Sequence, residues 1–164
     1  MNSSKKGGPD RAVFEREIEK LMESQEIRRM EQFGQHSGNN TLQHVRNVAF
    51  KSFELAQKLG WDIDEKVLAR GAILHDYYLY TCVNKHGIKA YKHGTGHPGL
   101  ALKNARKDFE LTEKEENIIE SHMWPLTLFH MPKSREAFLV CMADKYCAAN
   151  EMLLHRNNLE GKKQ

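Results

Sequence analysis

Residues 67–80 read VLARGAILHDYYLY, and this stretch decides the fold class. Apolar residues recur up to Leu74 at the spacing of one helix face, which predicts a helix packed against a core. His75 and Asp76 then stand side by side at the end of that helix. Burial of two ionisable groups costs free energy unless something compensates them, so the pair predicts partners elsewhere in the chain.

The same helical periodicity covers nearly the whole sequence, and neither an internal repeat nor an alternating strand pattern accompanies it. The pattern predicts an all-α, single-domain bundle of about five to seven helices. The predicted helices cover residues 11–30, 42–59, 64–76, 100–109, 112–124 and 134–154.

Cap and turn residues set the boundaries of these helices. The third helix is predicted to start at Asp62 or Asp64, and Thr112 opens a capping box with the glutamate three residues later. Residues 81–99 are rich in Gly, His and Lys, which predicts a loop. Pro98 is then expected at the start of the following helix.

Length, charge and composition limit the possible partners. The 164 residues suit one domain, with a disordered tail over 1–10, a helical domain over 11–156 and a flexible tail over 157–164. No apolar run is long enough to cross a membrane. The net charge of +3, with basic and acidic residues interspersed, argues against nucleic acid as a partner. Three cysteines without a CxxC pair predict free thiols in a reducing cytoplasm.

Nine histidines are more than a chain of this length normally carries. Several of them, with two aspartates, fall on or beside the apolar faces of the predicted helices, in the order His44, His75, Asp76, His97, His122 and Asp144. Asp144 lies within the apolar stretch LVCMADKYC, where a lone carboxylate is strongly disfavoured. A divalent ion compensates buried carboxylates, so these residues predict a site for one or two such ions. Ligation by N and O without cysteine favours iron or manganese over zinc, nickel, cobalt or magnesium.

The order H…HD…D resembles the signature of the HD-domain metal-dependent phosphohydrolases, an all-helical superfamily. The matching residues are His44, His75, Asp76 and Asp144. The resemblance covers roughly residues 35–152 and looks most like small bacterial HD hydrolases, including those that act on dinucleoside polyphosphates. It implies an HD-domain fold and metal-dependent phosphate chemistry.

Two further histidines, His97 and His122, resemble the H…HD…H…H…D variant that is associated with two-metal sites. Asp76 is the predicted catalytic bridge, because each of its oxygens can reach one ion. The other ligands are expected to divide into one group of His44, His75 and Asp144 and another of His97 and His122. His93 is an alternative to His97, and His122 could instead be a core histidine beside Trp124.

Many HD hydrolases carry a lysine shortly after the HD pair, but this chain reads HDYYLY there. A cation for the substrate phosphate is therefore expected from another position. The predicted substrate-binding residues are Arg70, Lys145, His36 and Lys92, with Lys85 and Lys89 as further candidates. Tyr77, Tyr78 and Tyr80 could stack on a base, but packing in the core is expected for at least two of them.

Together these features predict a metal-dependent phosphohydrolase that cleaves a phosphoester or phosphoanhydride of a nucleotide or other small phosphorylated molecule through a metal-activated hydroxide. A mixed-valence di-iron oxygenase, similar to inositol oxygenases, is an alternative because it uses the same ligand order. The missing lysine also leaves a non-catalytic metal- or nucleotide-binding module open. A cytoplasmic monomer or homodimer is expected, without nucleic acid or membrane as a partner.

Overall fold

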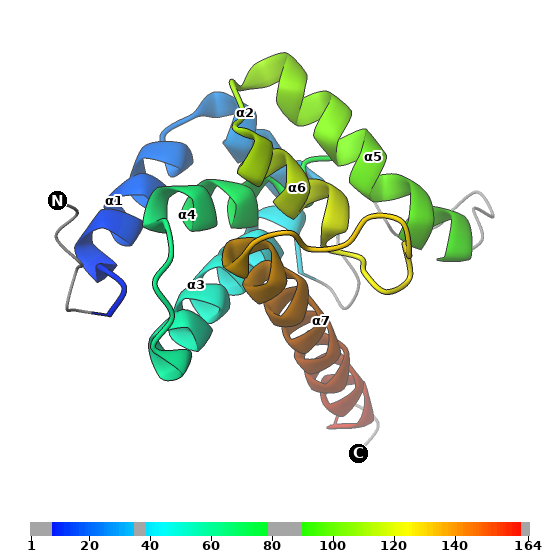
Figure 1. Ribbon diagram of the computed structural model, residues 1–164. Coiled ribbons are helices and arrows are strands. Elements are labelled where there is room, and N and C mark those ends of the chain that lie inside the picture. The colour runs from blue at the N-terminus through cyan, green and yellow to red at the C-terminus, as the bar shows by residue number, and fades with distance from the viewer. Residues whose placement is uncertain (1–7, 35–38, 79–89, 162–164) are drawn as a thin grey trace, which may run out of the picture.

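The computed structural model describes residues 8–34, 39–78 and 90–161, with the backbone alone described for 90–94 and 159–161. The described part of the chain forms seven α-helices and one short 3-10 helix, and no strand (Figure 1). The elements are α1 (Arg11–Met22), α2 (Gln25–Arg28), η1 (Arg29–Gln32), α3 (Thr41–Leu59), α4 (Glu65–Leu74), α5 (Ala90–Asp108), α6 (Glu113–Ser121) and α7 (Arg135–Gly161). The predicted all-α class is confirmed.

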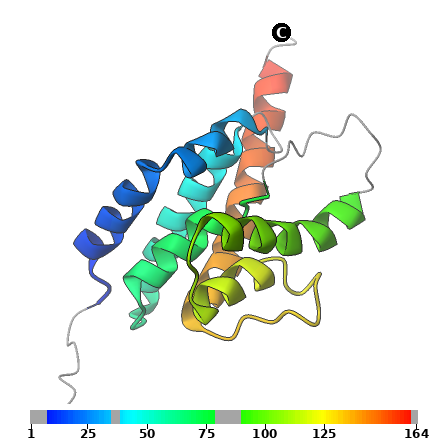
Figure 2. The ribbon, with the colours of Figure 1, turned by 90° about the horizontal axis from the view of Figure 1, so that it is seen from above.

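Helix α4 lies at the centre of the bundle and packs against α1, α3, α6 and α7. Eight of its ten residues are buried. Helices α3 and α7 pack against each other, and α5 covers α6. In both views α7 leaves the bundle and projects away from it toward the C-terminus (Figures 1 and 2). Because α4 is central, the residues that follow its last turn enter the interior rather than the solvent.

Side chains and one glycine fix the ends of the helices that carry the site. The Asn40 side chain accepts a hydrogen bond from the backbone of Gln43 at the start of α3, and Gly60 ends that helix in the left-handed region at φ 61°. Asp64, rather than Asp62, caps α4. The predicted capping box at Thr112 is present at the start of α6.

The prediction of one helix over residues 11–30 is wrong. Helix α1 ends at Met22, and Ser24 has extended backbone angles before α2 begins. Leu21 and Ile27 are both buried but six residues apart, which does not match the spacing of one helix face. The chain therefore breaks between them so that both side chains reach the core.

Two other boundaries also differ from the prediction. Helix α5 begins at Ala90, so Pro98 lies inside it rather than at its start. A proline inside a helix removes one backbone hydrogen bond, which is why the sequence indicated a boundary there. The helix is continuous because His97 shares its buried face with Ala101 one turn later. Helix α7 extends to Gly161, into the region expected to be a tail.

Among the described helices, none combines the length and the apolar character required to cross a membrane.

Helices α4 and α6 approach each other closely because a glycine lies at their crossing. A Cβ atom placed on Gly71 would lie 2.9 Å from Cγ2 of Ile118 and closer still to its Cδ1. A side chain at position 71 would therefore force Ile118 to shift.

We expect Gly71→Ala to lower the free energy of unfolding by about 1–3 kcal/mol, because the added methyl group overpacks the contact with Ile118. Gly99→Ala is the matched control, since it lies exposed in α5 with no atom within 4 Å of an added Cβ. The control should be neutral or stabilising by up to about 1 kcal/mol. Urea denaturation of both variants measures the difference, and equal stabilities would contradict the close packing.

Candidate metal centre

The six predicted ligands lie together in one cluster in the interior of the bundle. They are His44 in α3, His75 and Asp76 directly after α4, His97 in α5, His122 directly after α6, and Asp144 in α7. Each of the six is less than a tenth exposed. Five helices thus bring together side chains that are up to 100 residues apart in the sequence.

Asp76 lies between two pairs of histidines and turns one oxygen toward each. Its Oδ2 is 3.7 Å from Nε2 of His44 and 3.6 Å from Nε2 of His75. Its Oδ1 is 3.3 Å from Nε2 of His97 and 3.4 Å from Nε2 of His122. The carboxylate therefore has the geometry of a bridge between two neighbouring groups of donors.

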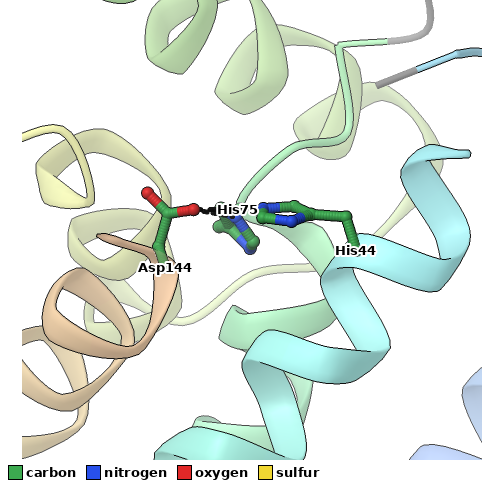
Figure 3. A group of neighbouring side chains, drawn as sticks. All are labelled: His44, His75 and Asp144. Atoms are coloured by element: carbon green, nitrogen blue, oxygen red, sulfur yellow. Dashed lines mark hydrogen bonds and ion pairs between the residues drawn. The ribbon is translucent and has the colours of Figure 1, made fainter. Parts of the chain in front are cut away.

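Asp144 completes the group on the Oδ2 side. Its Oδ1 lies 3.1 Å from Nε2 of His44 and 3.7 Å from Nε2 of His75. In Figure 3 the side chains of His44 and Asp144 point toward each other from facing helices, with His75 between them. Donor atoms of these three residues lie within 4.8 Å of one another, and so do those of His75, Asp76 and His122. Both groups have the composition and spacing to hold a metal ion.

The histidines that follow α4 and α6 are oriented in the same way. Nδ1 of His75 is 2.7 Å from the carbonyl oxygen of Ala72, and Nδ1 of His122 is 2.6 Å from that of Ile119. Each carbonyl belongs to the last turn of a helix, where backbone acceptors have no helical partner. A carbonyl can only accept, so the hydrogen lies on Nδ1 and the Nε2 lone pair faces the cluster.

This arrangement fits a metal ion. Nε2 of His75 is fully buried and has no hydrogen-bond partner among the described residues, which costs free energy unless a ligand uses the lone pair. A metal-binding histidine usually donates the N–H of one ring nitrogen to an oxygen acceptor, such as a carbonyl, and binds the ion through the other nitrogen. The donor set of imidazoles and carboxylates, without cysteine, suits iron, manganese or a similar divalent ion.

The buried charges are strongly coupled. Burial by itself would lower the pKa of His44, but hydrogen bonds to Asp144 and Glu151 outweigh it and raise that pKa to about 10. Burial would raise the pKa of Asp144, but the hydrogen bond from His44 and the nearby charge of His75 lower it well below the usual range. The pKa of Asp76 is lowered too, because the charge of His75 and the close contacts with His122 and His97 outweigh burial. A protonated imidazole thus provides positive charge where an ion would otherwise provide it.

Lys145 is the predicted substrate-binding residue whose side chain contacts the backbone of a candidate ligand. It follows Asp144 in α7, and its Nζ donates to the carbonyl oxygens of His122 at 3.0 Å and Cys141 at 3.2 Å. Carbonyl oxygens hold the ammonium group without neutralising its charge. Lys145 therefore places a cation against the backbone of His122, one of the candidate ligands.

Arg70 is not brought to the cluster. Its Nε donates to Oε1 of Glu115 at 2.5 Å, and its Nη2 donates to the carbonyl oxygen of Glu110 at 2.7 Å. These partners lie at the N-terminal end of α6, whereas His122 follows its C-terminal end. The guanidinium group is thus used to join α4 to α6, because Glu115 is buried and needs a compensating charge.

The remaining candidates divide between packing residues and residues outside the described part of the chain. Tyr77 is buried, and its hydroxyl donates to Asp108 at 2.8 Å. Tyr78 is buried with its ring edge-on to that of His97, at 5.6 Å between centroids. Packing of two tyrosines is therefore confirmed. Outside the described residues or side chains lie His36, Tyr80, Lys85, Lys89, Lys92 and His93.

Glu151 contacts the cluster but was not predicted. Its Oε2 lies 3.0 Å from Nδ1 of His44, and its Oε1 accepts a hydrogen bond from Asn47 at 3.1 Å. Glu151 comes seven residues after Asp144 in α7, which places both carboxylates on the same face of the helix. The seven-residue spacing from Asp144 was the feature of the sequence from which Glu151 could have been predicted.

Comparison with known proteins agrees with this geometry. The family model described as HD domain matches residues 41–149, a region that includes all six candidate ligands. The chain therefore belongs to the HD-domain superfamily, whose members are generally metal-dependent hydrolases. No curated protein and no solved structure matched the chain.

We expect Arg70→Met to lower the free energy of unfolding by about 2–4 kcal/mol without changing the metal content, because the buried Glu115 loses its partner. Arg106→Met is the matched control, since Arg106 pairs with Glu116 on the surface and should contribute less than about 1 kcal/mol. Denaturation and elemental analysis of the two variants check this. Loss of bound metal in Arg70→Met alone would show that Arg70 belongs to the site after all.

Proposed function

We propose that this protein is a phosphohydrolase that depends on two divalent ions and cleaves a phosphoester or phosphoanhydride of a small phosphorylated molecule such as a nucleotide. The observation that carries the proposal is the position of Asp76, which turns one oxygen toward His44 and His75 and the other toward His97 and His122. A bridging carboxylate between two sets of imidazoles is the arrangement that two-metal hydrolysis requires.

The ligands would divide between two ions, with iron or manganese favoured. One group is His44, His75, Asp144 and Oδ2 of Asp76, and the other is His97, His122 and Oδ1 of Asp76. Divalent ions bound in this way lower the pKa of a coordinated water to near neutrality and polarise a phosphoryl oxygen.

The protein itself would contribute three things to this reaction: fixed orientations of the ligands, surroundings of low polarity and a cation for the substrate. The carbonyl oxygens of Ala72 and Ile119 fix the rings of His75 and His122, so that the donor atoms need no reorganisation. The buried surroundings keep bulk water away from the ligands, which strengthens the electrostatic interactions inside. Lys145, which donates to the backbone of His122, would provide the cation that a lysine after the HD pair does not supply here. A phosphate oxygen of the substrate would bind there, and His36 and Lys92 stay predictions for further substrate contacts.

We expect protein loaded with manganese or iron to release phosphate or a nucleotide product from at least one member of a panel of nucleotides, dinucleoside polyphosphates and phosphate monoesters. Asp76→Asn should lower kcat by about 100-fold or more, because the amide cannot bridge two cations. Phosphate release and product chromatography measure both effects. Absence of turnover with metal demonstrably bound would contradict hydrolysis, and oxygen consumption by the iron form alone would favour an oxygenase.

Metal stoichiometry tests the number of ions separately from the reaction. We expect elemental analysis to find two equivalents in the wild-type protein and one in His122→Ala, because Oδ1 of Asp76 then keeps only His97 beside it. His130→Ala is the control, since this histidine is half-exposed and pairs with Glu120 on the surface. Two equivalents in all three proteins would exclude His122 as a ligand.

A further inference from the structure

Glu151 touches His44 on the side of the ring that faces away from the cluster. Its Oε2 lies 3.0 Å from Nδ1, whereas Nε2 of the same ring faces Oδ1 of Asp144 at 3.1 Å. Asn47 holds the other carboxylate oxygen with a hydrogen bond of 3.1 Å, and the Glu151 side chain is only 9% exposed. Glu151 is therefore fixed in place rather than solvated on the surface.

We propose that Glu151 is a positioning residue of the metal centre, which holds the His44 ring so that Nε2 can bind an ion. Because Nδ1 and Nε2 lie on opposite sides of the ring, Glu151 cannot share the ion that Nε2 binds. An ionised carboxylate only accepts hydrogen bonds, so it keeps a hydrogen on Nδ1, and Nε2 is then the nitrogen that would give up its hydrogen to bind an ion. This inference rests on the metal-binding part of the proposed function.

The position of His44 explains why its Nδ1 is held by a side chain rather than by a backbone carbonyl oxygen. His75 and His122 directly follow helices, and each bonds a carbonyl oxygen in the last turn. His44 lies near the start of the long helix α3, whose carbonyl oxygens are occupied by the helix itself. A partner for Nδ1 must come from another element, and α7 supplies Glu151.

A carboxylate does more for the ring than a carbonyl oxygen does. Its negative charge makes the opposite nitrogen a better donor to a cation, and such outer partners typically contribute 10- to 100-fold in metal affinity. Asp144 and Glu151 are two helical turns apart on α7, so one helix face contacts both nitrogens of His44. The ion on this side would thus depend on α7 for a ligand and for the orientation of a second ligand.

Zinc titration of the whole protein against a competing chelator tests this assignment, because zinc affinity is measured without any substrate. We expect Glu151→Ala to bind zinc on the His44 side about 10- to 100-fold more weakly than the wild type. Glu151→Gln should show a smaller loss, because the amide oxygen can still accept from Nδ1. Glu54→Gln is the matched control, since Glu54 pairs with Lys51 and Lys58 on the outer part of α3 and should leave the affinity unchanged.

Nitrogen-15 NMR of the zinc-loaded protein provides a readout that a purely structural role would not change. The hydrogen of His44 should lie on Nδ1 in the wild type and Glu54→Gln, and its signal should weaken or exchange in Glu151→Ala. Wild-type zinc affinity together with an unchanged His44 signal in folded Glu151→Ala would overturn the role of Glu151 but not the metal centre. Failure of the wild type to bind zinc would overturn the metal centre and this assignment with it.

Discussion

Two carboxylates inside an apolar bundle impose the main constraint on this structure. Asp76 and Asp144 are less than a tenth exposed, and an uncompensated charge in such surroundings costs several kcal/mol. Compensation of these two charges requires basic nitrogens from other helices, because neither aspartate has enough of them on its own helix. Helices α3, α5, α6 and α7 therefore bring their histidines or aspartates to the end of α4. The packing of the bundle and the composition of the site follow from the same electrostatic requirement.

The crossing of α4 and α6 sets the spacing within that cluster. Gly71 and Ile118, which meet at the crossing, each lie four residues before a histidine of the site. Because the offset of about one turn from the crossing is the same on both helices, His75 and His122 lie side by side, with ring centroids 4.9 Å apart. Each helix then ends, and its last carbonyls are available to hold the rings. The apolar contact between Gly71 and Ile118 thus determines the distance between the His75 and His122 rings.

The sequence was sufficient for the class of fold and for the order of candidate ligands, because each of those groups is costly where the apolar pattern would place it. It was insufficient where the decisive interaction is between helices. The break near Ser24 and the early start of α5 arise from burial against other elements, which a local pattern does not contain. Arg70 resembled a free cation because its partner, Glu115, lies on a different helix. Glu151 was overlooked for the same reason, since its partner His44 lies 107 residues earlier in the chain.

The wide separation of the ligands along the chain has a consequence for folding. An ion held by His44 and Asp144 would close a loop of about 100 residues, a cross-link of the kind that disulfides provide in other proteins. Unlike a disulfide, it would form and open with the concentration of free metal, and the stabilisation would grow as the logarithm of that concentration. Loosening of either α3 or α7 would release the ion. Metal occupancy would therefore report whether the first and last helices of the family region are docked on each other.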